Sequence, residues 1–411
     1  MRTEIQLQHK LYSFTSDGMV VSIIPFFLYP QRTVCKCTFG MFGATVFFRK
    51  MGLLVIHGAF CYSNTRKTEK EIPMATIKDV VRPGGVSAVN ESRIKYNMSD
   101  VMARNRRFYD EYVADLIYRK FGRYEERIAV GIVGEGSDCF GYDDLISRDH
   151  DFGTGVCLWL TDEDMDLFGY SLSIAYNELV DSIERANLTD RIRERRGVMR
   201  IHDFYSNILR IDCDTDFCRM TESDWYSLDH SCLKTATNGQ VFRDDLGVFT
   251  AFRKLLLQYY PERVWRRRIA EQLHIYAASL QVNYARCMTR GDIVAAELCR
   301  AQGLSAVMEL FFLLHREYPP YYKWTFRALQ NLDKEGTFSE KVQELAETCP
   351  SREAWKGTAY HPNRPNYKDR IISIAEELAY AIVKMLQEHV LSDSRDLYLE
   401  RYVNVVLGNQ W

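Results

Sequence analysis

The sequence predicts an α+β fold, in which a small mixed sheet with its helices precedes an all-α region. Between residues 98 and 224, short apolar runs of strand length alternate with amphipathic helical patterns. After residue 225, long segments carry apolar residues at i, i+3 and i+4 spacing, and breakers such as Pro261 and Gly291 separate them. No repeat period is evident, so we expect a helical domain or bundle over residues 225–411.

The α/β segment predicts elements in the order α-β-loop-β-α-β. Ser99 or Asp100 caps an amphipathic helix with Val101, Phe108, Tyr112, Leu116 and Ile117 on its apolar face, and Gly122 stands where that helix ends. Buried strands are expected at 128–134 and 155–160, an acidic-started helix at 162–187, and a third strand at 197–204. In the helical region we expect helices at 249–260, 264–288, 292–318, 341–349 and 370–391.

Residues 1–97 differ from the rest of the chain. Their apolar runs are interrupted by Pro25, Pro30 and isolated basic residues, and none reaches the roughly 18 charge-free residues that a membrane helix needs. Two interpretations stay open, a small β-rich appendage and a stretch upstream of the true start, with Met74, Met98 or Met102 as alternative starts. Because helix caps and clean periodicity are missing, we expect a poorly structured or spuriously included extension.

Composition narrows the class of protein and its partners. With 53 basic and 55 acidic residues the formal net charge is −2, so no global positive excess attracts nucleic acid or an anionic membrane. The 11 cysteines are scattered, and the close pair Cys35 and Cys37 has no second pair at zinc-ligand spacing. We therefore expect reduced thiols in a cytoplasmic protein without a membrane partner, and nucleic acid is an unexpected partner.

The candidate chemistry lies between residues 131 and 160. A strand that runs into Gly134-Glu135-Gly136-Ser137 and turns sharply directs backbone N–H groups outward, and the glycines have no Cβ to block a phosphate. Asp149 and Asp151 follow, and on an extended segment their side chains lie on the same side. Two adjacent carboxylates suit a divalent cation such as Mg²⁺, which prefers oxygen ligands. His150 between them is expected to face the opposite side.

This pattern of Gly136-Ser137 followed by Asp149-x-Asp151 resembles the polymerase-beta-like nucleotidyltransferase superfamily. Four wider stretches resemble a largely uncharacterised bacterial family of that superfamily, which has a helical C-terminal domain, over about residues 98–329; they are 134–153, 238–250, 281–292 and 318–324. The resemblance implies that Gly136 and Ser137 hold a nucleoside triphosphate and that Asp149 and Asp151 bind Mg²⁺ at the catalytic centre.

The resemblance also implies a third acidic residue on a later strand. Asp203 and Asp212 are the two candidates, and we take Asp203 as the expected catalytic residue. The middle residue His150 departs from the superfamily pattern, in which a small or apolar residue is commoner.

Basic residues of the helical region are further candidates. Asn283, Arg286 and Arg290 stand at i, i+3 and i+7 and share one helix face, so together with Lys323 and Arg253 they are expected to contact the nucleotide or the acceptor. The alternative is an interhelical network of salt bridges. The aromatic residues of 318–324 are expected to pack between elements.

We therefore expect a Mg²⁺-dependent nucleotidyltransferase. It would move a nucleoside monophosphate from a nucleoside triphosphate, expected to be ATP, to an unidentified small-molecule or protein acceptor. One alternative is a non-catalytic nucleotide-binding protein on the same fold. Another is an HD-type metal phosphohydrolase, which would need His150-Asp151 and His202-Asp203 at one metal site.

Overall fold

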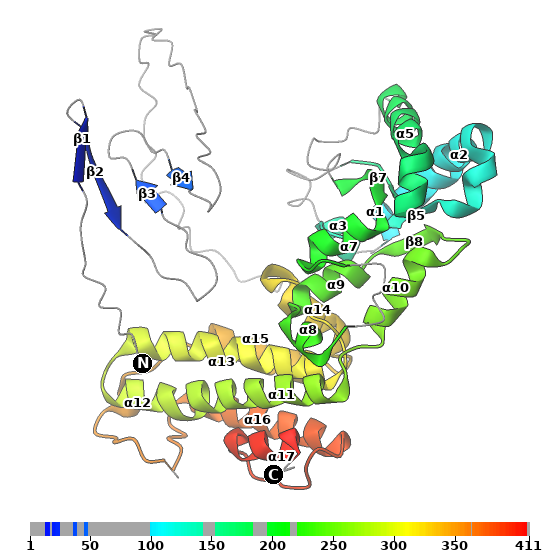
Figure 1. Cartoon of the computed structure of the whole chain (residues 1–411). Coiled ribbons are helices and arrows are strands. Elements are labelled where there is room, and N and C mark those ends of the chain that lie inside the picture. Colours follow the sequence, from blue (N-terminus) through cyan, green and yellow to red (C-terminus); the bar gives the residue numbers. More distant parts are fainter. Residues whose placement is uncertain are drawn as a thin grey trace, which may run out of the picture. The chain divides into compact units, whose positions relative to one another are not determined.

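The structure is a computed structural model, and it describes residues 13–16, 19–24, 36–38, 45–47, 99–142, 153–183, 195–213, 220–362 and 364–408. The chain divides into two compact units, Met1–Asn90 and Glu91–Trp411. In the first unit four short strands pair antiparallel in the order β1-β2-β3-β4 (Figure 1); they are β1 Ser13–Ser16, β2 Met19–Ile24, β3 Lys36–Thr38 and β4 Thr45–Phe47. That residues 1–97 are a poorly structured or spuriously included extension stays a prediction.

The second unit begins with the predicted helix. It runs as α1 Ser99–Phe108, the π-helical segment η2 Tyr109–Val113 and α2 Ala114–Phe121. The sequence predicted Tyr112 on the apolar face, assuming an uninterrupted α-helical period. That prediction is wrong, since the Tyr112 side chain is 43% exposed. The wider π-helical turn shifts the helix phase, so that Tyr109 and Val113 are buried in place of Tyr112.

The remaining elements of the α/β segment follow in the predicted order, and their bounds are η3 Gly122–Arg127, β5 Ala129–Ile132, α3 Ser137–Phe140, β6 Cys157–Leu160, α4 Asp162–Asp164, η5 Met165–Gly169, α5 Tyr170–Ser182, β7 Gly197–Arg200 and α7 Ile201–Leu209. The third strand was predicted to continue to residue 204, which is wrong: the chain turns into α7 at Ile201. Ile201, Phe204 and Tyr205 lie at helical spacing and are all buried, so helical packing prevails over the short strand-like run.

The second sheet is small and mixed, with strand order β7-β6-β5-β8. The strand β5 pairs antiparallel with both β6 and β8, whereas β6 and β7 are parallel. The strand β8, Gln240–Arg243, lies within the region predicted to be helical throughout, so that prediction is wrong at this point. Four residues are too few to give a recognisable period, and the strand forms because β5 offers an open edge.

Side chains of β5 and β6 alternate between the two faces of this sheet. One face packs against α1, α2 and α5, through Val130, Ile132, Leu158 and Leu160. The other face packs against α7 and α10, through Ala129, Val133, Cys157 and Trp159. All of these strand residues are buried, and the sheet is therefore covered by helices on both faces.

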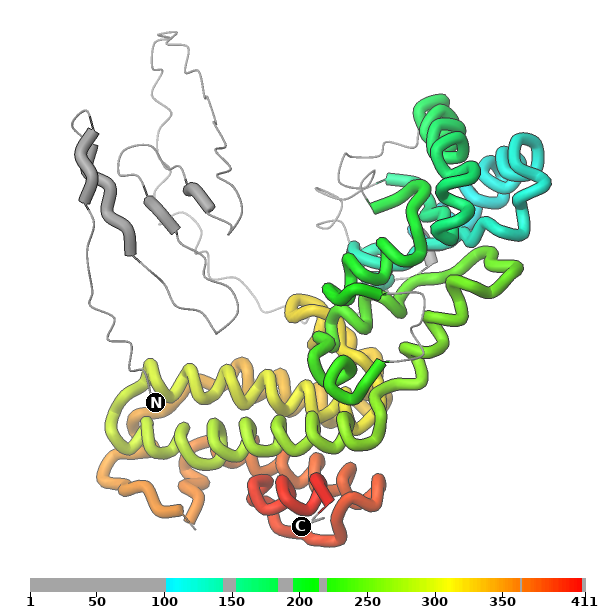
Figure 2. The backbone as a smooth tube through the Cα atoms, in the orientation of Figure 1, coloured from blue at the N-terminus to red at the C-terminus, as the bar shows by residue number. Residues whose placement is uncertain are grey.

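In the described residues after Met220 the remaining elements are helical apart from β8, as the apolar periodicity predicted. The elements are α8 Glu222–Ser227, α9 His230–Thr237, α10 Val248–Leu257, α11 Glu262–Tyr276, η7 Ala277–Asn283, α12 Tyr284–Thr289, α13 Ile293–Leu314, α14 Tyr322–Leu332, α15 Thr337–Glu347, η8 Glu353–Trp355, α16 Arg370–Glu388, η9 Leu399–Tyr402 and α17 Val403–Leu407. Figure 2 traces α11, η7 and α12 as one long rod, and α13 runs back alongside it.

One apolar cluster continues from the sheet into these helices. It joins Trp159 of β6 and Phe204 of α7 to Phe249 of α10, Trp265 of α11 and Ile382 of α16. The predicted boundary between residues 224 and 225 stays a prediction, and the cluster runs across it. Among the helices that the structure describes, none is both long enough and apolar enough to span a membrane.

Candidate functional site

The glycine-rich loop after β5 adopts a backbone that only glycine accepts readily. Gly134 and Gly136 have φ of 118° and 119°. At Gly136, ψ is 145°, and a Cβ there would overlap the Asp138 carboxylate. An L-residue is strained in this region of φ/ψ space, so the glycines are required for the turn from β5 into α3.

Asn238, the C-cap residue of α9, holds this loop. Its Oδ1 accepts a 2.8 Å hydrogen bond from the Gly134 N–H, and its Nδ2 donates a 2.7 Å bond to the Gly134 carbonyl. Asn238 is only 7% exposed and immediately precedes the turn into β8. Because both polar backbone groups of Gly134 are bound by one buried side chain, the loop is fixed in position.

Strand pairing brings four chain segments to one edge of the sheet. The register pairs Gly131 with Cys157, Cys157 with Gly197, and Ile132 with Gln240. The end of β5 therefore lies beside the starts of β6, β7 and β8. We call this the loop edge, and it comprises residues 134–137, 153–156, 195–197 and 238–239.

A buried ion pair anchors α3 to the start of β7. Arg196 donates from Nη2 to Asp138 Oδ2 at 2.6 Å, and its side chain is 4% exposed. The guanidinium also contacts the thiols of Cys139 and Cys157. Burial disfavours the charge of Arg196, but the Asp138 carboxylate and the hydrogen bond to the Cys139 sulfur outweigh it and hold the pKa of Arg196 well above its ordinary value. Burial raises the pKa of both thiols, so they are protonated at neutral pH.

Arg195 lies over the loop itself. Its Nε is 3.6 Å from Glu135 Oε2, and its side chain is 27% exposed. Arg253 lies nearby on α10 and donates to the carbonyls of Asn238 and Gly239. Burial lowers the pKa of Arg253. Arg253 therefore supports the turn into β8, and Arg195 is the arginine that faces the loop.

The start of α14 packs against α3. Tyr321 meets the Phe140 ring edge-on with 5.7 Å between centroids, and Trp324 lies 5.3 Å from Tyr142. Tyr321 and Trp324 thus pack between elements, as predicted for the aromatic residues of 318–324, whereas Tyr322 is 90% exposed. Lys323 is exposed between the Tyr321 and Trp324 rings, with Nζ 5.6 and 5.4 Å from their centroids. Lys323, which was predicted to bind the nucleotide, therefore lies on the helix α14, whose start contacts α3.

The predicted metal pair, Asp149 and Asp151, lies outside the described residues. The described chain resumes at Gly153, and the start of β6 is anchored there. Asn105 of α1 accepts from the Gly155 N–H at 3.0 Å, and the Tyr176 hydroxyl accepts from the Val156 N–H at 2.9 Å. The chain that leaves Asp151 therefore enters the sheet at the loop edge.

The candidates for the third carboxylate lie elsewhere. Asp203 is exposed in the first turn of α7, past the opposite end of β7 from the loop edge. Asp212 is also exposed, and its Oδ1 lies 3.2 Å from Nε2 of His202. Beside His202 is a groove of about 700 Å³, lined mainly by the apolar side chains of α10 and by Thr161 to Glu163 after β6. The structure does not bring Asp203 or Asp212 to the loop edge.

Asn283, Arg286 and Arg290 are exposed at the end of the rod formed by α11, η7 and α12. Arg286 donates to Asn283 Oδ1 at 3.4 Å and lies over the Tyr360 ring at 5.1 Å. Within the described part of the chain, Arg286 thus contacts Tyr360 of the 353–369 segment.

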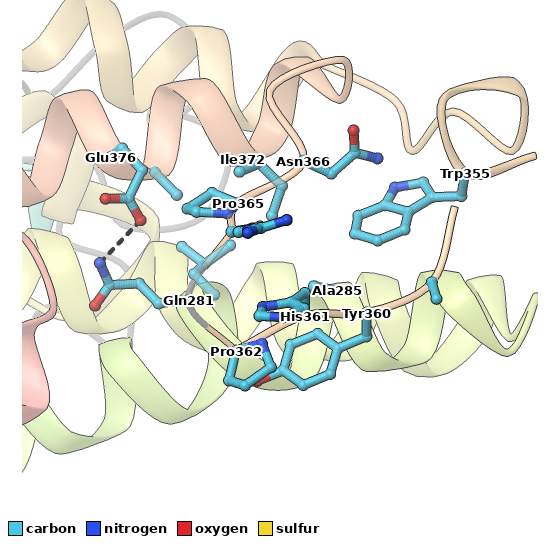
Figure 3. A pocket seen from close by; sticks show the side chains of 14 residues that line it. Gln281, Ala285, Trp355, Tyr360, His361, Pro362, Pro365, Asn366, Ile372 and Glu376 are labelled. Carbon is cyan, nitrogen blue, oxygen red and sulfur yellow. Dashed lines mark hydrogen bonds between the residues drawn. The ribbon is translucent and has the colours of Figure 1, made fainter. Parts of the chain in front are cut away.

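A small cavity of about 30 Å³ lies beside this segment, between Gln281 and Glu376 on one side and Trp355, Tyr360 and His361 on the other (Figure 3). Gln281 Nε2 donates to Glu376 Oε1 at 3.1 Å. Burial raises the pKa of Glu376. The cavity has the volume of about one water molecule, so it cannot hold a nucleotide.

Magnesium has no complete ligand set in the described residues. No group of three His, Cys, Asp or Glu side chains with metal-binding placement occurs among them. At the loop edge Asp138 is committed to Arg196, and Glu135 lies near Arg195. A Mg²⁺ site would therefore depend on Asp149 and Asp151.

Sequence reasoning missed Asn238, Asp138, Arg195 and Arg196. A weak signal existed for Asn238, since an Asn-Gly pair before an alternating run favours a turn into a strand. The basic run RIRERR before β7 is typical of a solvated helix face, yet Arg196 at its end is buried. No local pattern links these residues to the loop, because the contacts depend on strand pairing.

Comparison with known proteins gives one partial match. Neither a search of curated proteins nor a search of solved structures found a match. Residues 225–325 match the model of a family described as a domain of unknown function, DUF4037. This part of the chain contributes Asn238, Arg253 and α14 to the surroundings of the loop edge, and it is similar to a family whose description names no activity.

Proposed function

We propose that the loop edge binds the phosphates of a nucleoside triphosphate, expected to be ATP, and that the protein is a Mg²⁺-dependent nucleotidyltransferase with an unidentified acceptor. The observation that carries this proposal is the position of the 134–137 loop. It turns at the end of β5 on two glycines with positive φ, and Asn238 fixes it beside the start of β6.

Chain connectivity supports a role for the two aspartates at this edge. Consecutive Cα atoms are about 3.8 Å apart, so the Cα of Asp151 lies within about 7.6 Å of that of Gly153, and that of Asp149 within about 15 Å. Gly153 belongs to the loop edge. Chain connectivity thus permits both carboxylates to reach the proposed phosphate site.

The chemistry of this site is positioning and charge neutralisation. Mg²⁺, when bound by Asp149 and Asp151, would neutralise charge on the phosphates. The backbone of the loop would orient the triphosphate, and Ser137, half-buried at the start of α3, would offer its hydroxyl as a hydrogen-bond donor. Lys323 on α14 would add positive charge from the helical region.

A second candidate function is nucleotide binding without catalysis. It is favoured by the residues at the start of β7, where Arg195 and Arg196 precede Gly197. A catalytic carboxylate on this strand would have to lie at the loop edge, whereas Asp203 lies past the other end of β7, roughly 13 Å away for a four-residue strand. The same geometry disfavours the phosphohydrolase alternative. His202 follows the end of β7, whereas His150 and Asp151 precede the start of β6 at the opposite end of the sheet.

Calorimetric titration of the whole protein with ATP and Mg²⁺ tests the proposal. We expect saturable binding that is lost, by tenfold or more in affinity, in the double variant Asp149→Ala, Asp151→Ala. The matched control is Asp115→Ala, which removes an exposed carboxylate that pairs with Arg119 at 2.8 Å. Absent binding, or binding indifferent to the double variant, contradicts the proposal.

Pyrophosphate release separates the two candidate functions. A nucleotidyltransferase supplied with its acceptor releases pyrophosphate, and the double variant does not. Because Asp203 lies away from the loop edge, Asp203→Ala should change neither ATP binding nor pyrophosphate release. Binding without release across a panel of hydroxyl and phosphate acceptors would favour the non-catalytic candidate.

A further inference from the structure

A carboxylate lies against the glycine-rich loop. Asp138, the second residue of α3, places its carboxylate where a Cβ on Gly136 would have to lie. Its Oδ1 accepts a 2.9 Å hydrogen bond from the Cys139 N–H, and its side chain is only 15% exposed. A carboxylate repels a phosphate at short range, and the repulsion grows where water is partly excluded. If the loop binds phosphates, the charge of Asp138 has to be neutralised.

Arg196, the residue before β7, neutralises this carboxylate. Its Nη2 donates to Asp138 Oδ2 at 2.6 Å, and its side chain is 4% exposed. The same nitrogen lies 3.4 Å from the Cys139 sulfur. Burial raises the pKa of the Cys139 thiol, so this neighbour is uncharged at neutral pH. The pair of Arg196 and Asp138 therefore carries no net charge, and it lies beside the loop.

We propose that Arg196 masks the charge of Asp138 so that the loop can accept the phosphates of its nucleotide. This inference rests on the proposed function, because it names the ion pair that sets the charge of the same site. Arg196 does not touch the phosphates in this scheme, since Asp138 binds its guanidinium. It is a positioning residue that acts through Asp138, and its contribution to phosphate binding is electrostatic.

The sign of each mutational effect separates this role from a structural one. If the pair only held α3 against β7, loss of either partner would disturb the loop and weaken phosphate binding. Charge masking predicts opposite signs. Loss of Arg196 leaves an unmasked carboxylate beside the phosphates, whereas loss of the Asp138 charge leaves an unpaired guanidinium that attracts them.

Titration of the full-length protein with ATP and with inorganic tripolyphosphate, each with Mg²⁺, tests the masking. We expect Asp138→Asn to strengthen both affinities about threefold, because it removes a negative charge while its amide oxygen still accepts from the Cys139 N–H. Arg196→Met should weaken both about tenfold, because the carboxylate is left uncompensated. Arg196→Lys keeps the charge and should recover most of that loss.

The ion pair of Arg127 and Asp164 is the matched control. Arg127 Nη2 lies 2.5 Å from Asp164 Oδ1, and the Asp164 side chain is 2% exposed. Arg127 comes before β5 and Asp164 follows β6, so this pair lies at the opposite end of the sheet from the loop edge. Arg127→Met and Asp164→Asn should lower stability without changing either affinity.

The double variant Asp138→Asn, Arg196→Met completes the test. Both charges are absent from it, so it should bind ATP and tripolyphosphate within about twofold of wild type. Weaker binding in Asp138→Asn, or a double variant that binds no better than Arg196→Met, overturns the inference while the proposed function stands. If the wild-type protein binds neither ATP nor tripolyphosphate, both fail. Should Arg196→Met not fold, the gain in Asp138→Asn and the affinity of the double variant still decide.

Discussion

At the scale of single residues, the site depends on buried side chains that join segments far apart in the sequence. Asn238 binds the N–H and the carbonyl of Gly134 across 104 residues of sequence, and Arg196 binds Asp138 across 58. Gly134, Asn238 and Arg196 are buried, so each broken bond would leave a polar group without a partner away from water. Loop geometry is therefore coupled to stability.

Asn238→Ala should lower the free energy of unfolding by about 2–4 kcal/mol, because it leaves both backbone groups of Gly134 unpaired. Asn238→Asp should also destabilise the fold, since its buried carboxylate still accepts from the Gly134 N–H but has no donor for the Gly134 carbonyl. Urea unfolding measures both changes. The control is Asn207→Ala, an exposed residue of α7, which should change stability by less than about 0.5 kcal/mol. Equal losses of stability in Asn238→Ala and Asn207→Ala would refute the role of Asn238 in holding Gly134.

Glu376 and Glu377 predict opposite dependences on pH. Burial raises the pKa of Glu376, so the folded protein holds its proton above the pH at which the unfolded chain releases it. Stability from this group is complete below the ordinary glutamate pKa and is lost as pH rises through the raised one. Glu376→Gln should therefore gain stability relative to wild type at pH 7 compared with pH 4.

Glu377 provides the matched comparison. The Lys341 ammonium, which lies 2.6 Å away, and then Arg370 hold the pKa of Glu377 below its ordinary value. Its stabilising contribution is present above the ordinary glutamate pKa and is lost as pH falls through the lowered one. Glu377→Gln should accordingly be destabilising at pH 7 and neutral in strong acid. Urea unfolding from pH 3 to 8 measures both variants, and trends of the same sign would contradict the assignment.

At the scale of elements, close helix packing decides where small residues are needed. The helix α13 carries Gly303 against η7, and a Cβ there would overlap Leu280 Cγ and lie 2.5 Å from its Cδ1. Leu280 is fully buried. The rod of α11, η7 and α12 can therefore approach α13 closely only at a glycine.

Gly303→Ala tests which of two effects is larger. Helix propensity favours alanine by about 1 kcal/mol, whereas overpacking of a buried contact costs about 1–3 kcal/mol. We expect net destabilisation in thermal or urea unfolding. The control is Gly122→Ala, since a Cβ at Gly122 meets nothing within 4 Å and its φ is −52°. A stabilising Gly303→Ala would show that α13 moves away from η7.

At the scale of the whole molecule, residues 91–411 form one compact unit. Trp159 of β6 stacks on Phe249 of α10 with 3.9 Å between ring centroids, and Tyr205 of α7 packs on Phe252 at 4.1 Å. These rings join the sheet to the helical region across the predicted boundary at residue 224. Contacts of this size, buried in a shared core, favour cooperative unfolding.

Native-state hydrogen exchange tests this cooperativity. With rising denaturant, the slowest amides of β6, such as Leu158, and of α11, such as Leu273, should converge on one global opening free energy. Separate convergence of the two sets would show that the segments on either side of residue 224 open independently.

Local sequence signals identified most elements but not their partners. Apolar periodicity located the long helices and the buried runs of β5 and β6, because burial of one helix face or a whole strand imposes a pattern that is visible over ten residues or fewer. The same signals failed at Tyr112, at Ile201 and at β8. There the π-helical turn, the packing of α7 and the open edge of β5 decide the conformation.

By itself, the sequence determined the α+β class, the glycine-rich turn after β5 and the long helices, since each follows from local propensity and periodicity. Only the tertiary structure decided what surrounds the loop. Strand pairing sets Arg195, Asn238 and the start of β6 beside Gly134 and Gly136, and it leaves Asp203 at the far end of β7. The physical reason is that register joins residues more than a hundred positions apart, and no local pattern encodes that distance.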